Sequence, residues 1–209
     1  MCSSDLLEFA KKYNLEVIPV VSPIKSKSLM INNQAYTDDG YIINSDFLND
    51  LSVEDAKKYV IEKTLLSDRW AFSQKSDGSK PDNYTFWQLY LDNDDFFRVT
   101  FFNKIKKLTG KDYDIERIYA NGQTYGLPGA FHRDTKEPNG RTFLYYVNPE
   151  WKADWGGETI FYTEKTPTII FPVPNSAVLF DGNIPHFGKD PSRKTNILRV
   201  TLAFKLFEK

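Results

Sequence analysis

The C-terminal stretch Ile197-Leu198-Arg199-Val200-Thr201-Leu202-Ala203-Phe204-Lys205-Leu206 repeats with a period of two. Every second residue from Leu198 to Leu206 is large and apolar, which predicts a β-strand with one face in a hydrophobic core. The opposite face carries Arg199. If the apolar face packs against helices, Arg199 points into a sheet sandwich, where a guanidinium needs an anion and hydrogen-bond acceptors. Its planar fork suits a small dicarboxylate, whereas the alternative is an exposed sheet face with Arg199 in water.

Further short apolar segments precede this strand from Tyr113 onward, separated by Gly, Pro, Asn and Asp. They lie at residues 115–119, 142–147, 159–162, 168–173 and 177–180. Many short strands at this spacing favour a β-sandwich or barrel of the jelly-roll type. The predicted fold class is therefore mainly β with supporting α-helices, around a double-stranded β-helix (jelly-roll, cupin-like) core.

The first half of the chain has a different pattern. Ser52, followed three positions later by Asp55, resembles a capping box and predicts the start of a helix. A second helix is expected over residues 94–108, with Gly110 just past its end. A short helix over 5–12, a strand over 15–21 and a polar loop over 74–85, either a solvated connection or a lid, are also expected. We predict a single domain over residues 1–209, with a mostly helical supporting segment at 1–112 and the jelly-roll core at 113–209.

Composition narrows the class of protein. A formal net charge of −1 gives no global field that would recruit nucleic acid or an anionic membrane. The single cysteine, Cys2, cannot form an internal disulfide. The N-terminus has no signal-peptide pattern, and no stretch reaches membrane-spanning length. We expect a soluble, cytoplasmic protein that is a monomer or a weak oligomer.

The two histidines of the chain, His132 and His186, point to a metal site. Asp134 follows His132 by two positions, and on a strand such residues share one face. With His186 from a neighbouring strand, they would form the arrangement of two histidines and one carboxylate that suits non-haem Fe(II) and leaves coordination positions open. The alternative is a surface pair or a hydrogen-bonded structural histidine.

Taken together, His132-x-Asp134, His186 and Arg199-x-Thr201 resemble the Fe(II)- and 2-oxoglutarate-dependent oxygenases, and within them the prolyl 4-hydroxylase-like group. The resemblance covers roughly residue 115 to the C-terminus. Three further segments resemble motifs of this group: Tyr119-Ala120-Asn121-Gly122-Gln123-Thr124-Tyr125, Leu144-Tyr145-Tyr146-Val147-Asn148 and Gly156-Gly157-Glu158-Thr159. The N-terminal half shows no resemblance to a known family.

The resemblance implies roles for individual residues. His132, Asp134 and His186 would bind the metal, and Arg199 would pair with the distal carboxylate of 2-oxoglutarate. Hydroxyl groups for the same co-substrate would come from Tyr119, Tyr146 and Thr159. Tyr125 would lie on the substrate side, and Arg141 resembles a substrate-contacting arginine, although it is two residues nearer the Tyr145-Tyr146 strand than the group's pattern has it. Residues 126–131 also make a longer connection to His132 than collagen-type relatives have.

The activity that the resemblance implies is hydroxylation of an unactivated C–H bond, with release of succinate and CO2. The substrate would be a peptidyl prolyl or other amino-acid side chain, presented by a peptide or a small molecule. The implied cofactors are Fe(II), 2-oxoglutarate and O2, with ascorbate as a further candidate. Two alternatives remain open: a nucleic-acid demethylase of the same superfamily, for which Arg193 and Arg199 are six residues apart, and a non-catalytic metal-binding jelly-roll module.

Overall fold

The computed structural model describes residues 21–22, 41–42, 52–76, 84–163 and 166–209. The chain divides into two compact units, Met1–Val60 and Ile61–Lys209. Whether they act as the single domain expected from the sequence stays a prediction. The expected helix at 5–12 lies outside the described residues, as does all but the last residue of the strand expected at 15–21. In the described part of the chain, no helix is both long enough and apolar enough to cross a membrane.

In the first unit, the described residues form a small ladder and the start of a helix. Strand β1 (Val21–Ser22) pairs with β2 (Tyr41–Ile42) in antiparallel register. Helix α2 (Val53–Lys63) begins after Ser52, whose Oγ accepts a hydrogen bond from the Asp55 backbone N–H at 3.0 Å and donates to the Asp55 carboxylate at 2.8 Å. These contacts confirm the predicted helix start, because they satisfy an amide that has no partner within the helix.

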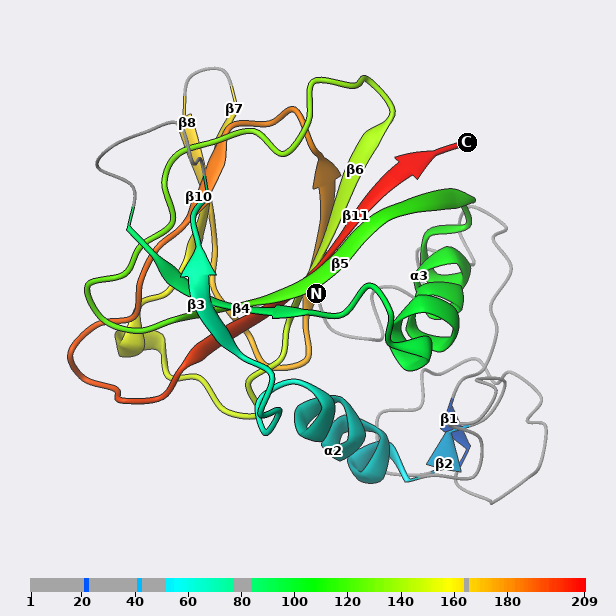
Figure 1. Cartoon of the computed structure of the whole chain (residues 1–209), viewed down its shortest axis with the longest axis horizontal. Coiled ribbons are helices and arrows are strands. Elements are labelled where there is room, and N and C mark those ends of the chain that lie inside the picture. The colour runs from blue at the N-terminus through cyan, green and yellow to red at the C-terminus, as the bar shows by residue number, and fades with distance from the viewer. Residues whose placement is uncertain (1–20, 23–40, 43–51, 77–83, 164–165) are drawn as a thin grey trace. The chain divides into compact units, whose positions relative to one another are not determined.

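The second unit contains two antiparallel sheets (Figure 1). The larger has the order β3-β4-β5-β11-β6-β9, and the smaller has the order β10-β7-β8. The strands of the larger sheet are β3 (Ala71–Gln74), β4 (Phe86–Tyr90), β5 (Tyr113–Gln123), β6 (Gly140–Tyr146), β9 (Ala177–Asp181) and β11 (Arg199–Glu208). Those of the smaller sheet are β7 (Thr159–Thr163), β8 (Thr166–Ile170) and β10 (His186–Gly188).

Most of the predicted strands are present, and the mainly β, jelly-roll prediction is confirmed. Strands β3 and β4 were not predicted: they extend the large sheet at one edge, within a segment expected to be mostly helical. Strand β3 is exposed along most of its length, so it carries little of the apolar alternation that marks a half-buried strand. The short strand β10 was also missed.

The second predicted helix forms in two parts. A π-helical segment, η2 (Phe96–Phe101), continues directly into α3 (Phe102–Thr109), and Gly110 follows with a φ of 64°. A left-handed residue suits glycine and confirms the predicted end. Phe97 and Ile105 of this segment are fully buried, whereas Leu108 near its end is exposed.

This helical segment covers the outer face of the large sheet. The ring of Phe101 stacks on that of Phe204 with centroids 5.4 Å apart, and it also contacts Phe143 and Tyr145 edge-on. The apolar face of β11 therefore packs against helical residues, as its sequence predicted. Since side chains alternate along a strand, the other face of β11 is turned toward the small sheet.

Replacing Phe204 should test this packing. Phe204 is fully buried in the central strand β11. Phe204→Ala should therefore lower the free energy of unfolding by about 3–5 kcal/mol, measured by chemical denaturation, because it leaves a cavity beside Phe101. Phe171→Ala, the same change at an exposed site, should cost less than about 1 kcal/mol. Equal losses in the two variants would contradict the packing described here.

Candidate metal centre and its pocket

A cavity of about 190 Å³ lies between the two sheets, lined by residues of both. Its floor is the inner face of β5, β11 and β6, and the register of these strands orders the floor into rows. Arg199 is opposite Gln123; Thr201 is opposite Asn121 and Tyr146; Ala203 is opposite Tyr119 and Leu144; Lys205 is opposite Arg117 and Thr142. The site is therefore a strip with Arg199 at one end and Lys205 at the other.

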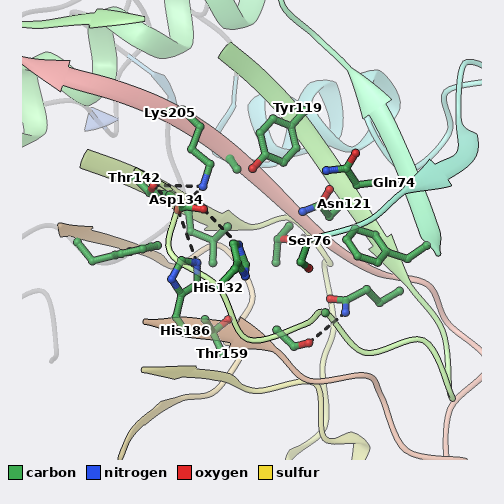
Figure 2. A pocket seen from close by; sticks show the side chains of 18 of the residues that line it. Gln74, Ser76, Tyr119, Asn121, His132, Asp134, Thr142, Thr159, His186 and Lys205 are labelled. Atoms are coloured by element: carbon green, nitrogen blue, oxygen red, sulfur yellow. Dashed lines mark hydrogen bonds and ion pairs between the residues drawn. The ribbon is translucent and has the colours of Figure 1, made fainter. Parts of the chain in front are cut away.

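The three predicted metal ligands meet at one wall of this cavity (Figure 2). His132 and His186 form an antiparallel bridge in which each backbone N–H donates to the carbonyl oxygen of the other, at 3.0 and 2.9 Å. One ligand atom from each of His132, Asp134 and His186 lies within 4.8 Å of the others. The Nε2 atoms of the two rings are 3.3 and 3.5 Å from the two carboxylate oxygens of Asp134.

Backbone contacts set the orientation of both imidazoles. Nδ1 of His132 lies 2.8 Å from the carbonyl oxygen of Ala130, and Nδ1 of His186 lies 2.9 Å from that of Ile184. A carbonyl oxygen can only accept, so each Nδ1 carries the proton and donates it. In the neutral ring, Nε2 then keeps its lone pair. Both lone pairs face Asp134, which is the arrangement that a metal-binding histidine pair requires.

Asp134 is held in place by several groups. Its backbone N–H donates to the carbonyl oxygen of Gly182 at 2.8 Å, and the Thr142 hydroxyl donates to its Oδ2 at 2.6 Å. Lys205 forms an ion pair with the same oxygen. Burial, the largest influence, would raise the pKa of Asp134, but the Lys205 charge and the contacts with both histidines together hold that pKa well below its usual range. The carboxylate is therefore ionised at neutral pH.

His186 lies in apolar surroundings. The Phe161 ring stacks on its imidazole with centroids 5.6 Å apart, and the Phe180 ring meets it edge-on at 4.8 Å. Burial lowers the pKa of His186 to about 4, opposed by the charge of Asp134 and reinforced by His132. The ring is therefore neutral at pH 7, the form that binds a metal ion.

Arg199 is buried at the far end of the floor and bonded only to neutral groups. It donates to the Gly157 carbonyl oxygen at 2.5 Å, to Gln123 Oε1 at 2.8 Å and to Thr159 Oγ1 at 3.0 Å. Gly157 has a φ of 78°, and a Cβ there would lie 2.9 Å from Arg199 Cδ, so only glycine allows this approach. Among the described residues, no carboxylate forms an ion pair with the guanidinium, and the charge of Glu158 acts on it only at longer range, so this buried cation has no direct carboxylate partner.

Two of the three predicted hydroxyl donors, Tyr146 and Thr159, lie close to Arg199, whereas Tyr119 lies nearer to Lys205. The Tyr146 hydroxyl donates to Thr159 Oγ1 at 2.8 Å, and the Arg199 guanidinium lies 5.8 Å from the centroid of the Tyr146 ring. Tyr119 and Thr159 line the cavity directly. Tyr145 faces the other way: its ring contacts Phe101 and its hydroxyl donates to Asn175. Of the tyrosine pair, Tyr145 is thus the one that serves packing.

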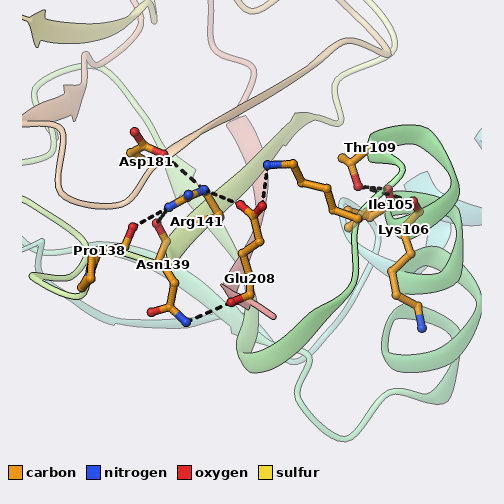
Figure 3. Close-up of polar contacts among 10 residues, drawn as sticks. Ile105, Lys106, Thr109, Pro138, Asn139, Arg141, Asp181 and Glu208 are labelled. Carbon is orange, nitrogen blue, oxygen red and sulfur yellow. Dashed lines mark hydrogen bonds and ion pairs between the residues drawn. The ribbon is translucent and has the colours of Figure 1, made fainter. Parts of the chain in front are cut away.

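The two predicted substrate residues are not brought into the cavity. Tyr125 is about half exposed, with the Arg193 guanidinium 4.6 Å from its ring centroid. Arg141 pairs with Asp181 at 3.2 Å and Glu208 at 2.9 Å (Figure 3). It precedes Thr142, which faces the cavity, and alternation along β6 turns Arg141 to the other side. Its contacts are those of a surface ion-pair cluster.

Several cavity residues were not singled out from the sequence. Lys205 had a detectable signal, because it shares the strand face of Arg199 and Thr201. Gln123 stands in the recognised segment before His132, but its bond to Arg199 depends on strand pairing that a local pattern does not reveal. Other cavity residues without a predicted role are Gln74, Ser76, Arg117, Asn121 and Arg133.

The part of the chain that carries this site is similar to known oxygenases. Residues 117–204 match the model of the 2OG-Fe(II) oxygenase superfamily. The chain is similar to a prolyl hydroxylase from Trichoplax adhaerens, solved with a hypoxia-inducible factor peptide: the TM-score is 0.54 at 18% identity, over 74% of this chain and 77% of that one. It is also similar to a 2OG-Fe(II) oxygenase family oxidoreductase from Burkholderia pseudomallei, with a TM-score of 0.54 at 12% identity, over 74% and 78% of the two chains. At these identities the structural likeness concerns the fold.

The N-terminal segment is similar to a different class of protein. Residues 4–65 match the model of the leucyl-tRNA synthetase editing domain. Leucine–tRNA ligases from Parvibaculum lavamentivorans and Campylobacter concisus are 45% identical over 67 residues and 48% identical over 56 residues. These matches cover 27% of this chain but only 8% and 7% of the ligases. The expectation that the N-terminal half resembles no known family is therefore wrong.

Proposed function

We propose that this chain is a 2-oxoglutarate-dependent dioxygenase that hydroxylates an unactivated C–H bond of a peptidyl prolyl or other amino-acid side chain. The match of residues 117–204 to the 2OG-Fe(II) oxygenase superfamily and a fold similar to that of a prolyl hydroxylase support this proposal. The observation that supports this most directly is the orientation of His132 and His186 toward Asp134, with Arg199 buried nearby and lacking a carboxylate partner among the described residues.

The residues present fit the implied metal. Two imidazoles and one carboxylate form the donor set of a non-haem Fe(II) site, and carbonyl oxygens already hold the Nδ1 atoms. His132 Nε2, His186 Nε2 and the Asp134 carboxylate would hold the ion. Arg199 and the hydroxyl groups of Thr159, Tyr146 and Tyr119 would hold 2-oxoglutarate. When bound, these groups together with O2 supply the oxidative decarboxylation that yields succinate, CO2 and a hydroxylated product.

Residues of this chain orient the metal ligands, exclude water and bind the co-substrate. The carbonyl oxygens of Ala130 and Ile184 keep the two rings in the tautomer that binds a metal. Phe161 and Phe180 shield one side of His186 from water. Arg199 offers parallel donors to a carboxylate at a position fixed by Gln123 and Gly157. The chemistry requires no side-chain nucleophile or general base, and Asp134 is the only acidic residue lining the cavity in the described part of the chain.

The test begins with binding. The metal-free protein should be stabilised against thermal unfolding by Mn(II) and further by 2-oxoglutarate in the presence of Mn(II). Succinate formation with Fe(II), O2 and 2-oxoglutarate should then be screened over proline-containing peptides, free amino acids and oligonucleotides, with and without ascorbate. Stimulation by a proline peptide or an amino acid is the expected result. Stimulation only by oligonucleotides would replace the proposal with a demethylase, and stabilisation without succinate under any condition would replace it with a binding module.

A further inference from the structure

We propose that the substrate carries a carboxylate and that Lys205 binds it inside the cavity. This inference rests on the proposed function and specifies its substrate class. Lys205 belongs to the central strand β11, and its side chain is only 5% exposed. Figure 2 shows it extending toward Asp134 and Thr142, beside the two histidines. A lysine buried to this degree requires an anionic partner.

The partner that Lys205 has in this structure is itself a predicted metal ligand. Its ammonium forms an ion pair with Asp134 and donates to Thr142 Oγ1 at 3.2 Å. Once the Asp134 carboxylate is shared with a divalent cation, its negative charge no longer compensates Lys205. Lys205 is then a buried cation next to the divalent cation, and an additional anion would stabilise the lysine.

The rest of the cavity increases this need. Its lining includes the buried cations Arg199 and Lys205 and the exposed cations Arg117 and Arg133, whereas Asp134 is the only acidic lining residue in the described chain. Arg117 and Lys205 are directly opposite each other on paired strands, an arrangement of like charges that is unfavourable by itself. The Arg117 guanidinium and the Lys205 ammonium lie 5.3 and 5.8 Å from the centroid of the Tyr119 ring. The attraction between a cation and an aromatic ring is weak, so it offsets only part of the repulsion between the two charges.

The Lys205 end is separate from the predicted 2-oxoglutarate end. Lys205 and Arg199 are six residues apart on one strand, which places their Cα atoms about 20 Å from each other. Their side chains also have different partners: Asp134 and Thr142 for Lys205, and Gly157, Gln123 and Thr159 for Arg199. One carboxylate group therefore does not satisfy both cations, and we assign the anion at Lys205 to the second substrate.

An amino-acid substrate supplies a carboxylate in either of two ways. It can be the α-carboxylate of a free amino acid, or a C-terminal or acidic side-chain carboxylate of a peptide. A cavity of about 190 Å³ suits a group of this size. Both sources share the chemistry that Lys205 recognises, so the experiment uses matched acids and amides from each.

The experiment measures binding without turnover. Matched acids and amides are titrated calorimetrically into the protein with Mn(II) and 2-oxoglutarate, in the absence of O2. The pairs are free amino acids and their α-amides, and proline-containing peptides with free or amidated C-termini and with Glu or Gln side chains. Among the compounds that bind, the acid should bind about ten- to a hundredfold more tightly than its amide. Lys205→Met should abolish that preference and Lys205→Arg should retain it. Lys209→Met, which removes an exposed positive charge one residue beyond β11, should leave it unchanged.

Each outcome decides the inference. Loss of the preference in Lys205→Met alone supports it, and the matched pair that shows the effect identifies the source of the carboxylate. Equal affinity for acids and amides, a preference that survives in Lys205→Met, or no binding of any acid at millimolar concentration would overturn it. Stabilisation of Lys205→Met by Mn(II) and 2-oxoglutarate shows that the variant is folded. Failure of that stabilisation in the wild type would instead count against the proposed function.

Discussion

His132→Ala should reduce 2-oxoglutarate-dependent succinate formation by well over about a hundredfold. Loss of a partner that only orients a metal ligand typically costs ten- to a hundredfold, and loss of a ligand itself should cost more. His132 is the better choice than Asp134 for this test. Removing the Asp134 carboxylate would leave the buried Lys205 without its ion-pair partner, so lost activity could reflect lost folding. His132 is partly exposed, and among the described residues its imidazole makes polar contacts with the Ala130 carbonyl oxygen and the Asp134 carboxylate and a ring contact with His186.

Three measurements should accompany the succinate assay. Thermal unfolding of the metal-free variant should stay close to that of the wild type, and stabilisation by Mn(II) should disappear. Lys136→Ala, an exposed charge four residues further along the same segment, should retain succinate formation. Wild-type rates in His132→Ala would show that the metal site is elsewhere or that turnover does not depend on it.

The site was predictable to the extent that it is encoded in short-range patterns. The alternation of β11 places Arg199 on the inner face. His132 lies beside Asp134 as the i, i+2 spacing predicted, but the expected strand is absent there: His132 forms an isolated bridge and Asp134 lies in a bend. Short-range spacing does not reveal that a bridge between the His132 segment and strand β10 would bring His186 to His132. Nor does it show that Lys205 would reach Asp134 across the floor of the cavity, since this depends on the pairing of β11 with β6.

Other features lay beyond such patterns for definite physical reasons. The exposed edge strand β3 has no buried face to generate a period of two. Arg141 resembled a substrate residue by sequence position, although it is two residues nearer the Tyr145-Tyr146 strand than expected. A shift of two residues does not change the face of a strand on which a side chain lies. Alternation along β6 turns Arg141 away from the cavity, and it pairs with Asp181 and Glu208 instead. The likeness of residues 4–65 to an editing domain lies in residue identities rather than in hydrophobic periodicity, so a pattern-based interpretation missed it.

Arg199 should determine the affinity for 2-oxoglutarate. Arg199→Met should weaken 2-oxoglutarate binding by at least about thirtyfold, because truncating one partner of a buried charged pair costs roughly 2–5 kcal/mol. Stabilisation by Mn(II) alone should persist, since the hydrogen bonds of Arg199 in the described part of the chain go to Gly157, Gln123 and Thr159 and not to the predicted metal ligands. Arg199→Lys should bind with intermediate affinity: it restores the charge but not the two parallel donors of a guanidinium.

The control for this prediction is Arg98→Met, an exposed arginine on η2, which covers the opposite face of the large sheet. It should bind 2-oxoglutarate like the wild type. The metal-free Arg199→Met variant should also be somewhat less stable, because Gln123 Oε1, Thr159 Oγ1 and the Gly157 carbonyl oxygen lose a donor in a buried site. If 2-oxoglutarate binding were unchanged in Arg199→Met while this stability fell, the guanidinium would be a structural cation that cross-links β5, β7 and β11, and the co-substrate carboxylate would have to bind at the Lys205 end of the floor.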